Sequence, residues 1–331
     1  MIENNQQQIN YFLDHHSQIK LPLTENINIK ILGFNYRSSI LVLGKSDGKI
    51  QIYQFKYDAI KLIKEINSST SKAYCLLFLK KSNQIIFVNN KIQIYSEIGI
   101  NRGCYLFQIE GPKPNCLILN KDENLLICGS NDKAIRFWRK NKNQWNFHQK
   151  YQISHYGVII SLSLDDSENY LICLSELENS IFICQRNKFT NFWSVFQIIY
   201  CKESQALQAC FIKDSIFILQ LYKGENFKFY HQNQETLYFQ PFNPFILDKC
   251  NPLQISHRFQ LQIIKQRQFL IYRKDNCINI LLIKSQNNYE FIKLVTLIDS
   301  NFIFRATEDG KYLVIWQQNN SLLLVSLLNE I

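Results

Sequence analysis

The 331-residue sequence predicts an all-β chain folded as a seven-bladed β-propeller, in which an N-terminal strand completes the last blade. Two observations lead to this prediction. Seven segments end in one pattern, which is an apolar residue, any residue, a second apolar residue and then a bulky residue. Counted between last positions, these endings are 42, 43, 46, 46, 51 and 44 residues apart, at or slightly above the about 40 to 45 residues of a four-stranded blade. The endings occupy residues 50–53, 92–95, 135–138, 181–184, 227–230, 278–281 and 322–325.

Each repeat is expected to contain an inner strand, a second strand, a third strand that carries the ending, and an outer strand. Blade three shows this order most clearly, with a first turn at residues 120–124 and a hairpin turn at 129–133. Asn, Asp and Gly occur in these turns, and they tolerate the positive φ that such turns need. The outer strand then begins near Trp145 and ends at Ile153.

The other blades follow the same order with local differences. Their defining segments are 41–43 with the turn 44–48 in blade one, the short turn 89–90 in blade two, 158–162 and 170–173 in blade four, 215–219 in blade five, 269–272 in blade six and 312–316 in blade seven. We place one domain at residues 1–331, with blades at about 28–66, 72–109, 114–153, 158–199, 207–241, 259–297 and 301–326.

The last blade is expected to lack an outer strand of its own, because the sequence ends soon after its third strand. An open sheet edge needs a partner strand or another cover. Residues 11–19 can be aligned with the outer strand of blade three, 145–153, so that aromatic, apolar and Gln-Ile positions match. We therefore predict that residues 9–20 form the strand that completes blade seven.

Composition favours a cytosolic protein with a large apolar core. Apolar residues make up 46% of the chain, yet no stretch approaches the length of a membrane-spanning helix, and the N-terminal residues are polar and rich in Gln. The ten cysteines include no Cys-x-x-Cys spacing, and most of them lie in or beside apolar runs. Free thiols pack there as small hydrophobic groups, so we expect reduced cysteines and a cytoplasmic location.

The formal net charge of +10 does not by itself indicate an anionic partner. Lys accounts for 28 of the 37 basic residues, and the chain is also rich in Asn, Ile, Phe and Tyr, which A/T-rich codons encode. The basic residues are scattered through every blade and form no block of five. We therefore expect no nucleic-acid partner and no membrane partner. The segment 304–307 has only the Phe and one Arg of the Phe-Arg-Arg-Gly motif with which some propellers bind phosphoinositides.

The segment 125–139, which contains Asp132 and Trp138, resembles a repeat of the WD40 family. Residues 145–155 and 158–164 look like the following outer strand and the opening of the next repeat. The composition, rich in Lys, Asn and Gln, is similar to that of WD40 proteins from ciliates. By period the resemblance covers the whole chain, whereas by motif it covers blades one, three and four.

The resemblance implies a hydrogen-bonded set of His, Ser or Thr, Asp and Trp within a blade. No repeat contains the full set, so apolar burial, worth roughly 25 cal/mol per Å², is expected to provide most of the cohesion of a blade. The positions that match part of the set are Asp47, Asp132, Trp138, His155, His257 and Asp275.

No catalytic, metal-binding or cofactor-binding motif occurs in the sequence. The six histidines and ten cysteines have no metal-ligand spacing, and there is no nucleophile elbow, phosphate loop or dinucleotide motif. Paired carboxylates such as Asp165 and Asp166 fall in expected turns, where they are solvated. We therefore expect a protein that is not an enzyme and needs no cofactor or metal.

The segment 232–258 is the most irregular part of the chain, because it contains three of the six prolines. Proline interrupts strand pairing, so we expect a loop or a distorted outer strand here. Its aromatic residues could form a partner-binding loop, or they could fill the gap between blades five and six. These residues are Tyr238, Phe239, Phe242 and Phe245.

Together these features predict a non-catalytic protein–protein interaction platform, either a scaffold or an adaptor subunit, whose partners are other proteins. Two alternatives remain open at this point. One is a propeller enzyme with a site in a central channel, built from side chains far apart in the sequence. The other is a propeller that binds phosphoinositides or nucleic acid.

Overall fold

The computed structural model describes residues 16–19, 29–56, 59–67, 75–82, 84–96, 105–142, 144–153, 157–176, 180–201, 206–221, 224–225, 227–242, 249–250, 261–274, 276–284, 289–297, 302–317 and 322–327. The chain divides into two compact units. The first consists of Met1–Ile86, Tyr95–Cys104 and Gln254–Ile331, and the second of Phe87–Ile94 and Tyr105–Leu253.

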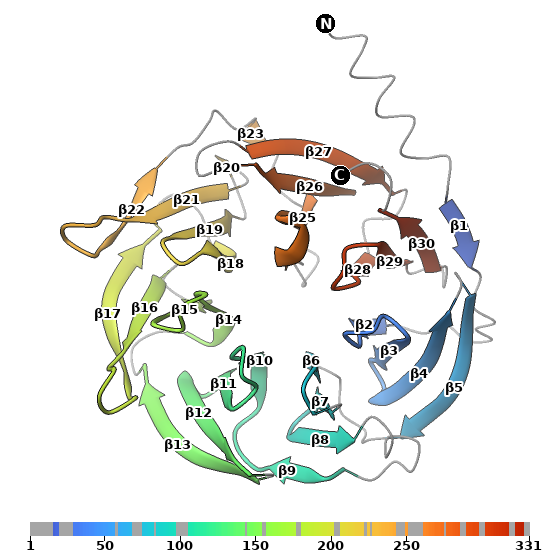
Figure 1. Cartoon of the computed structure of the whole chain (residues 1–331), viewed down its shortest axis with the longest axis horizontal. Helices are drawn as coiled ribbons and strands as arrows, with labels where there is room; N and C mark the ends of the chain where they lie inside the picture. Colours follow the sequence, from blue (N-terminus) through green and yellow to red (C-terminus); the bar gives the residue numbers. More distant parts are fainter. Residues whose placement is uncertain are drawn as a thin grey trace, which may run out of the picture. The chain divides into compact units, whose positions relative to one another are not determined.

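The described residues form seven four-stranded antiparallel sheets and one two-stranded sheet (Figure 1). Each four-stranded sheet is one blade, and within most blades the strands follow one another in chain order. The predicted fold class, an all-β seven-bladed β-propeller whose last blade is completed by an N-terminal strand, is confirmed.

Blades one, six and seven belong to the first unit. Blade one contains β2 (Ile29–Phe34), β3 (Ile40–Lys45), β4 (Lys49–Lys56) and β5 (Ala59–Asn67). Blade six contains β24 (Leu261–Ile264), β25 (Phe269–Lys274), β26 (Cys277–Ile283) and β27 (Tyr289–Thr296), with a short 3-10 turn, η2, at Lys265–Arg267. Blade seven contains β28 (Phe302–Ala306), β29 (Tyr312–Gln317), β30 (Leu322–Ser326) and β1 (His16–Ile19).

Blades three, four and five belong to the second unit. Blade three contains β10 (Pro114–Leu119), β11 (Leu125–Ser130), β12 (Ala134–Asn141) and β13 (Gln144–Gln152). Blade four contains β14 (Ile159–Leu164), β15 (Tyr170–Ser175), β16 (Ser180–Arg186) and β17 (Trp193–Tyr200). Blade five contains β18 (Ala206–Lys213), β19 (Ile216–Leu221), β21 (Phe227–Gln232) and β22 (Phe239–Phe242).

Blade two contributes residues to both units. Its strands are β6 (Cys75–Leu79), β7 (Gln84–Val88), β8 (Ile92–Ser96) and a short outer strand, β9 (Phe107–Ile109). The two-stranded sheet pairs β20 (Gly224–Glu225) with β23 (Lys249–Cys250) in the second unit.

A single side chain closes the turn between the inner and second strands of several blades. In blade three, Oδ1 of Asn120 accepts the backbone N–H groups of Asn124 and Leu125 at 2.9 and 2.8 Å. Asn35 does the same in blade one, at 2.8 and 3.0 Å. Glu123 takes a positive φ of 57° in the blade-three turn. Short polar side chains thus set the registers in which the apolar strands pair.

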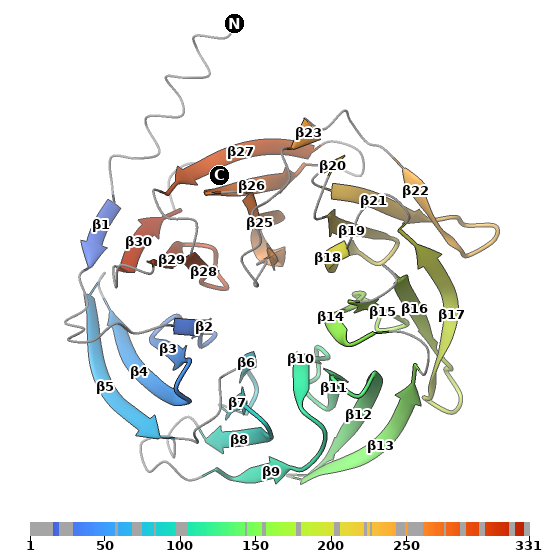
Figure 2. The same ribbon diagram turned by 180° about the vertical axis from the view of Figure 1, so that it is seen from behind.

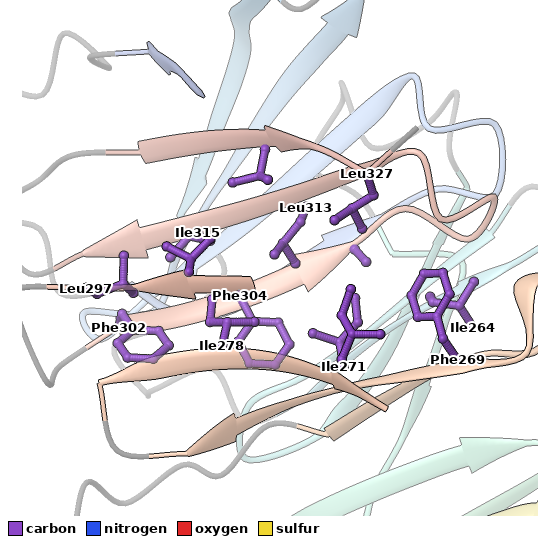
Figure 3. Close-up of a cluster of buried hydrophobic side chains, with 14 residues drawn as sticks. Ile264, Phe269, Ile271, Ile278, Leu297, Phe302, Phe304, Leu313, Ile315 and Leu327 are labelled. Atoms are coloured by element: carbon purple, nitrogen blue, oxygen red, sulfur yellow. The ribbon is translucent and has the colours of Figure 1, made fainter. Parts of the chain in front are cut away.

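The hydrophobic core lies between consecutive blades. Figure 3 shows the cluster between blades six and seven, where Phe269 and Ile271 of β25 belong to the same buried group as Phe304 of β28 and Ile315 of β29. Equivalent clusters join blades seven and one in the first unit, and blades three, four and five in the second. Each large side chain buried in this way contributes roughly 1.5 to 3 kcal/mol.

The N-terminal strand completes blade seven as predicted. β1 runs antiparallel to β30, with His16 opposite Val325 and Ile19 opposite Leu322, and both views place the two strands side by side (Figures 1 and 2). The structure describes residues 16–19 of the strand expected at 9–20, and the rest lies outside the described residues.

Blade five contains the irregular outer strand that the prolines predicted. Pro241 lies in β22, the edge strand of its sheet, which pairs only with β21. Proline has no backbone N–H, and at an edge strand this interrupts no pairing with a further strand.

The described cysteines are free thiols. Burial raises the pKa of the Cys173 thiol, which favours its neutral form. Cys128, Cys173, Cys184 and Cys201 are buried, and Cys75, Cys116, Cys210 and Cys277 are half-buried. Within the ranges described above, no helix has the length and apolar character needed to cross a bilayer.

Candidate partner-binding surface

Two hairpin turns with the same construction lie in the second unit, before the outer strands of blades four and five. In blade four, Oδ1 of Asn187 accepts the N–H groups of Phe189 and Thr190 at 2.9 and 3.0 Å. The hydroxyl oxygen of Thr190 then accepts the N–H of Phe192 at 3.3 Å. Asn191 closes the turn with a φ of 61° and donates to the carbonyl of Asn187 at 2.8 Å.

The blade-five turn repeats these contacts 46 positions later. Asn233 accepts the N–H groups of Glu235 and Thr236 at 2.9 and 3.0 Å, and Thr236 accepts that of Tyr238 at 3.4 Å. Leu237 takes the positive φ, 62°, that Asn191 has in blade four. The shared spacing of Asn, Thr and two aromatic residues therefore encodes one preformed turn in both blades.

A glutamine from the preceding blade holds the end of each turn. Gln149 of β13 donates to the Trp193 carbonyl at 2.6 Å and accepts the Trp193 N–H at 2.8 Å. Gln197 of β17 holds Phe239 in the same way, at 2.9 and 2.8 Å. Trp193 and Phe239 are both buried. These pairs of hydrogen bonds tie the outer strands of blades three, four and five together, in the order seen in Figures 1 and 2.

Large side chains stand exposed on these clamped strands and turns. Phe189, at the tip of the blade-four turn, is 96% exposed, and Phe147 of β13 is 60% exposed. Phe192 is half-exposed and stacks on His148 with ring centroids 5.0 Å apart. Tyr238 stacks on Phe196 at the same distance, 5.0 Å. Rigid exposed aromatic groups of this kind are typical of binding surfaces.

The charges on the outer hairpins of blades three and four have one sign. The strands and turns at residues 134–152 and 180–200 contain no Asp or Glu. We use the name aromatic-basic surface for the exposed and half-buried Phe, Lys and Arg residues at positions 139–150 and 186–192. Its members are Arg139, Lys140, Lys142, Phe147, Lys150, Arg186, Lys188, Phe189 and Phe192.

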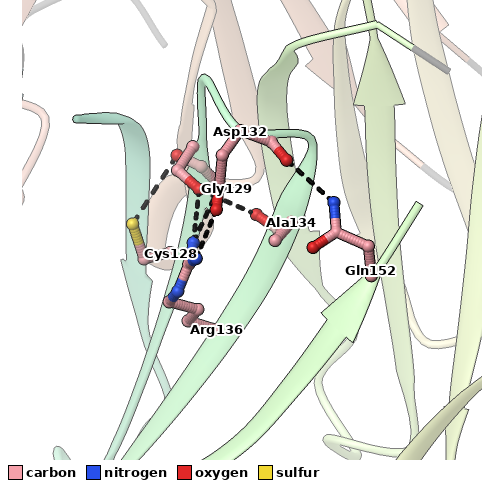
Figure 4. A network of polar contacts seen from close by, with 7 residues as sticks. Cys128, Gly129, Asp132, Ala134, Arg136 and Gln152 are labelled. Atoms are coloured by element: carbon pink, nitrogen blue, oxygen red, sulfur yellow. Dashed lines mark hydrogen bonds and ion pairs between the residues drawn. The ribbon is translucent and has the colours of Figure 1, made fainter. Parts of the chain in front are cut away.

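The structure places Asp132 of blade three in a polar network that the sequence did not predict (Figure 4). Arg136 donates to Ser130 at 2.7 Å and to Asp132 at 2.9 Å, with a second, shorter contact to the same carboxylate. These contacts lower the pKa of Asp132 to about 2. Gln152 binds the Asp132 carbonyl at 2.8 Å. Trp138 is buried on the same face of β12 as Arg136.

Asp47 has a local role in blade one. Its side chain is exposed and accepts the N–H of Lys49 at 3.0 Å, which closes the turn before β4. Nearby, the buried side chains of Lys45 and Gln51 donate to the exposed Glu65 at 2.8 and 2.7 Å. The remaining repeat positions, His155, His257 and Asp275, lie outside the described residues, as does Phe245.

The aromatic residues predicted for a partner-binding loop have different environments. Phe239 is buried against Tyr170 and Phe211, so it packs between blades four and five. One interpretation of the sequence was that these aromatic residues fill the gap between blades five and six. For Phe239 that location is wrong, because Gln197 of blade four binds its backbone. Tyr238 is exposed, and Phe242 is half-buried beside His231, with centroids 5.2 Å apart.

Two recurring features of the sequence mark the buried polar residues and the clamping glutamines, which were not predicted. The second position of each repeated ending is polar in several blades, and its side chain is buried there, as Gln51, Gln93, Arg136 and Asn279 are. An aromatic residue followed four positions later by Gln begins the outer strand both at Trp145 and at Trp193. These two recurrences locate the buried polar clusters and the glutamine clamps.

The described residues offer no obvious ligand chemistry at these sites. No three His, Cys, Asp or Glu side chains within the described ranges are grouped so that they could hold a metal ion. In the segment 304–307, which was compared above with the phosphoinositide-binding motif, Phe304 of β28 is buried and Arg305 is half-buried.

No protein-family model matches this chain, and no curated protein matches it.

Proposed function

We propose that this chain is a non-catalytic protein–protein interaction platform, a scaffold or adaptor of the WD40 type. The observation that carries the proposal is the aromatic-basic surface, where Phe189 is 96% exposed on a turn held by its own hydrogen bonds and by Gln149. Exposed aromatic side chains on rigid elements supply contact area at low entropic cost, because little has to be ordered on binding.

The WD40 assignment rests on blade three. Asp132 and Trp138 occupy positions that the resemblance identifies, and Arg136 donates to Asp132 and to Ser130 in place of a His. The likeness to WD40 proteins of ciliates remains part of the proposal. A cytosolic location is also part of it, because the described cysteines are free thiols, which suit a reducing compartment.

The proposal includes no catalytic role. Asp132 of blade three accepts hydrogen bonds from Arg136 and Ser130. Its lowered pKa keeps it ionised at neutral pH, so it is a poor proton donor or acceptor there. These contacts support a structural role for the network, and the exposed side chains nearby support binding.

The test is affinity capture with the whole chain as bait, followed by quantitative mass spectrometry. The variant K188E/F189S changes the aromatic-basic surface at two exposed positions. The matched control is K61E/L62S, which makes the same kinds of change at exposed residues of β5 in the first unit. We expect the wild type and the control to capture a common set of proteins, and we expect K188E/F189S not to capture them. Identical sets for all three baits, at equal melting temperatures, would contradict the proposal.

A further inference from the structure

Four basic residues of the aromatic-basic surface have no ion-pair partner among the described residues. Arg139, Lys142, Arg186 and Lys188 form no ion pair with any described residue. The Nε atoms of Arg139 and Arg186 are also buried without a hydrogen-bond partner among the described groups. The positive charges of these four residues are therefore not compensated by described acidic groups, and an acidic partner can pair with them.

Two acidic groups in the inner turns of blades four and five bind the preceding blade. Glu168, in the first turn of blade four, accepts the N–H of Lys121 at 2.8 Å and an N–H of Asn120 at 3.1 Å. Asp214 of blade five accepts the N–H of Ser167 at 2.6 Å. These carboxylates tie successive inner turns together, so they do not neutralise the outer hairpins.

The basic and aromatic residues of the blade-four turn lie beside the outer strand of blade three. His148 of β13 lies 3.3 Å from the carbonyl oxygen of Asn191, which places the outer strand of blade three against the hairpin turn of blade four. Lys188 and Phe189 are adjacent at the tip of that turn. A binding partner must therefore present negative charge and apolar groups within a short distance of each other.

We infer that the aromatic-basic surface binds an acidic segment of a partner protein in which Asp or Glu residues alternate with large apolar residues. The inference rests on the proposed function and specifies the class of partner. Phe189 and Phe192 provide apolar contact area, and Arg186 and Lys188 pair with the carboxylates. Charge complementarity also speeds association, and this effect decreases as salt screens the charges.

A fluorescence anisotropy titration with labelled peptides tests the inference directly. The probe is a short peptide in which Glu alternates with Leu. One control peptide replaces Glu with Lys, and the other replaces Leu with Ser. We expect the Glu-Leu peptide to bind the whole chain about tenfold or more tightly than either control, which corresponds to about 1.4 kcal/mol. Binding should weaken several-fold when salt is raised from about 0.05 to 0.5 M.

The variants connect the binding to this surface. K188E/F189S should weaken the Glu-Leu peptide about tenfold or more, and K61E/L62S should leave its affinity unchanged. Equal affinities for the three peptides, or no effect of salt on the wild type, would overturn the inference whether or not the variant folds. Phosphatidylglycerol vesicles serve as a second probe, and binding to them alone would also overturn it. Affinity capture could find partners that K188E/F189S loses while the Glu-Leu peptide fails to bind. That result would support the proposed interaction platform and reject only the acidic class of partner.

Discussion

Arg136 and Trp138 project from the same face of β12, so one strand supplies both a polar tie and a large apolar side chain to blade three. Arg136 holds Ser130 and Asp132, which lie in and just after β11. The hydrogen-bonded set implied by the WD40 resemblance includes a His, but here a guanidinium makes the contacts. Its several N–H donors reach two acceptors at once, which a single imidazole N–H cannot do.

Replacing Trp138 with Ala should destabilise the protein by about 3 to 5 kcal/mol, because the side chain is 6% exposed and its removal leaves a cavity. Urea unfolding measures the effect. Phe189→Ala is the control, and at 96% exposure it should change the free energy of unfolding by less than about 0.5 kcal/mol. A loss below about 1 kcal/mol for Trp138→Ala would mean that this indole is not part of the core.

Asp132 should make stability depend on pH in the acid range. Its pKa is about 2 in the folded protein because Arg136 and Ser130 bind the carboxylate, whereas an unfolded Asp titrates near about 3.9. The stabilisation that the ionised Asp132 carboxylate provides is therefore complete above about pH 5, and it is lost as the pH falls through about 4 toward 2.

The comparison with Asp132→Asn isolates this contribution. Free energies of unfolding measured at about pH 6 and pH 3 should fall more in the wild type than in the variant, since the amide does not titrate. Equal losses would show that the contact with Arg136 does not lower the pKa of this carboxyl group.

At the scale of the strand, the glutamine clamps explain how the outer strands of blades three to five are held. Gln149 and Gln197 each satisfy one N–H and one carbonyl of the residue that begins the next outer strand. Gln262 of β24 makes the same pair of bonds to Ala306 of β28 in the first unit, at 3.0 and 2.9 Å. An amide suits this role because it is both a donor and an acceptor.

Gln149→Ala should cost about 1 to 3 kcal/mol, because it removes two hydrogen bonds and leaves backbone groups next to a buried Trp193 unsatisfied. The decisive measurement is amide hydrogen exchange, in which the Trp193 N–H should lose protection. Gln144→Ala, at an exposed position on the same strand, should leave both stability and exchange unchanged. Unaltered Trp193 protection in Gln149→Ala would show that the clamp contributes nothing.

At the scale of the whole molecule, completion of blade seven joins the two ends of the chain. β1 supplies the fourth strand to a sheet whose other three strands come from residues 302–326. Without it, β30 would present an unpaired edge.

Deletion of residues 1–21 should lower the melting temperature by roughly 5 °C or more, because a full strand pairing is lost. Deletion of residues 1–8 is the matched control, since it spares the strand predicted at 9–20, and it should leave the transition in place. A melting temperature unaffected by the longer deletion would mean that β1 does not hold blade seven together.

The sequence alone determined the number of blades, their spacing and the strand that completes the last one. These features are readable because each repeat encodes its own alternation of apolar residues and its own turns. Phe239, Arg136 and Gln149 could not be placed in this way, since their partners come from a neighbouring strand or blade. The Gln149 clamp joins residues 44 positions apart, so only the packing of one blade on the next decides which amide reaches Trp193. The same packing buries Phe239 and leaves Phe189 exposed, because burial depends on what the next blade covers.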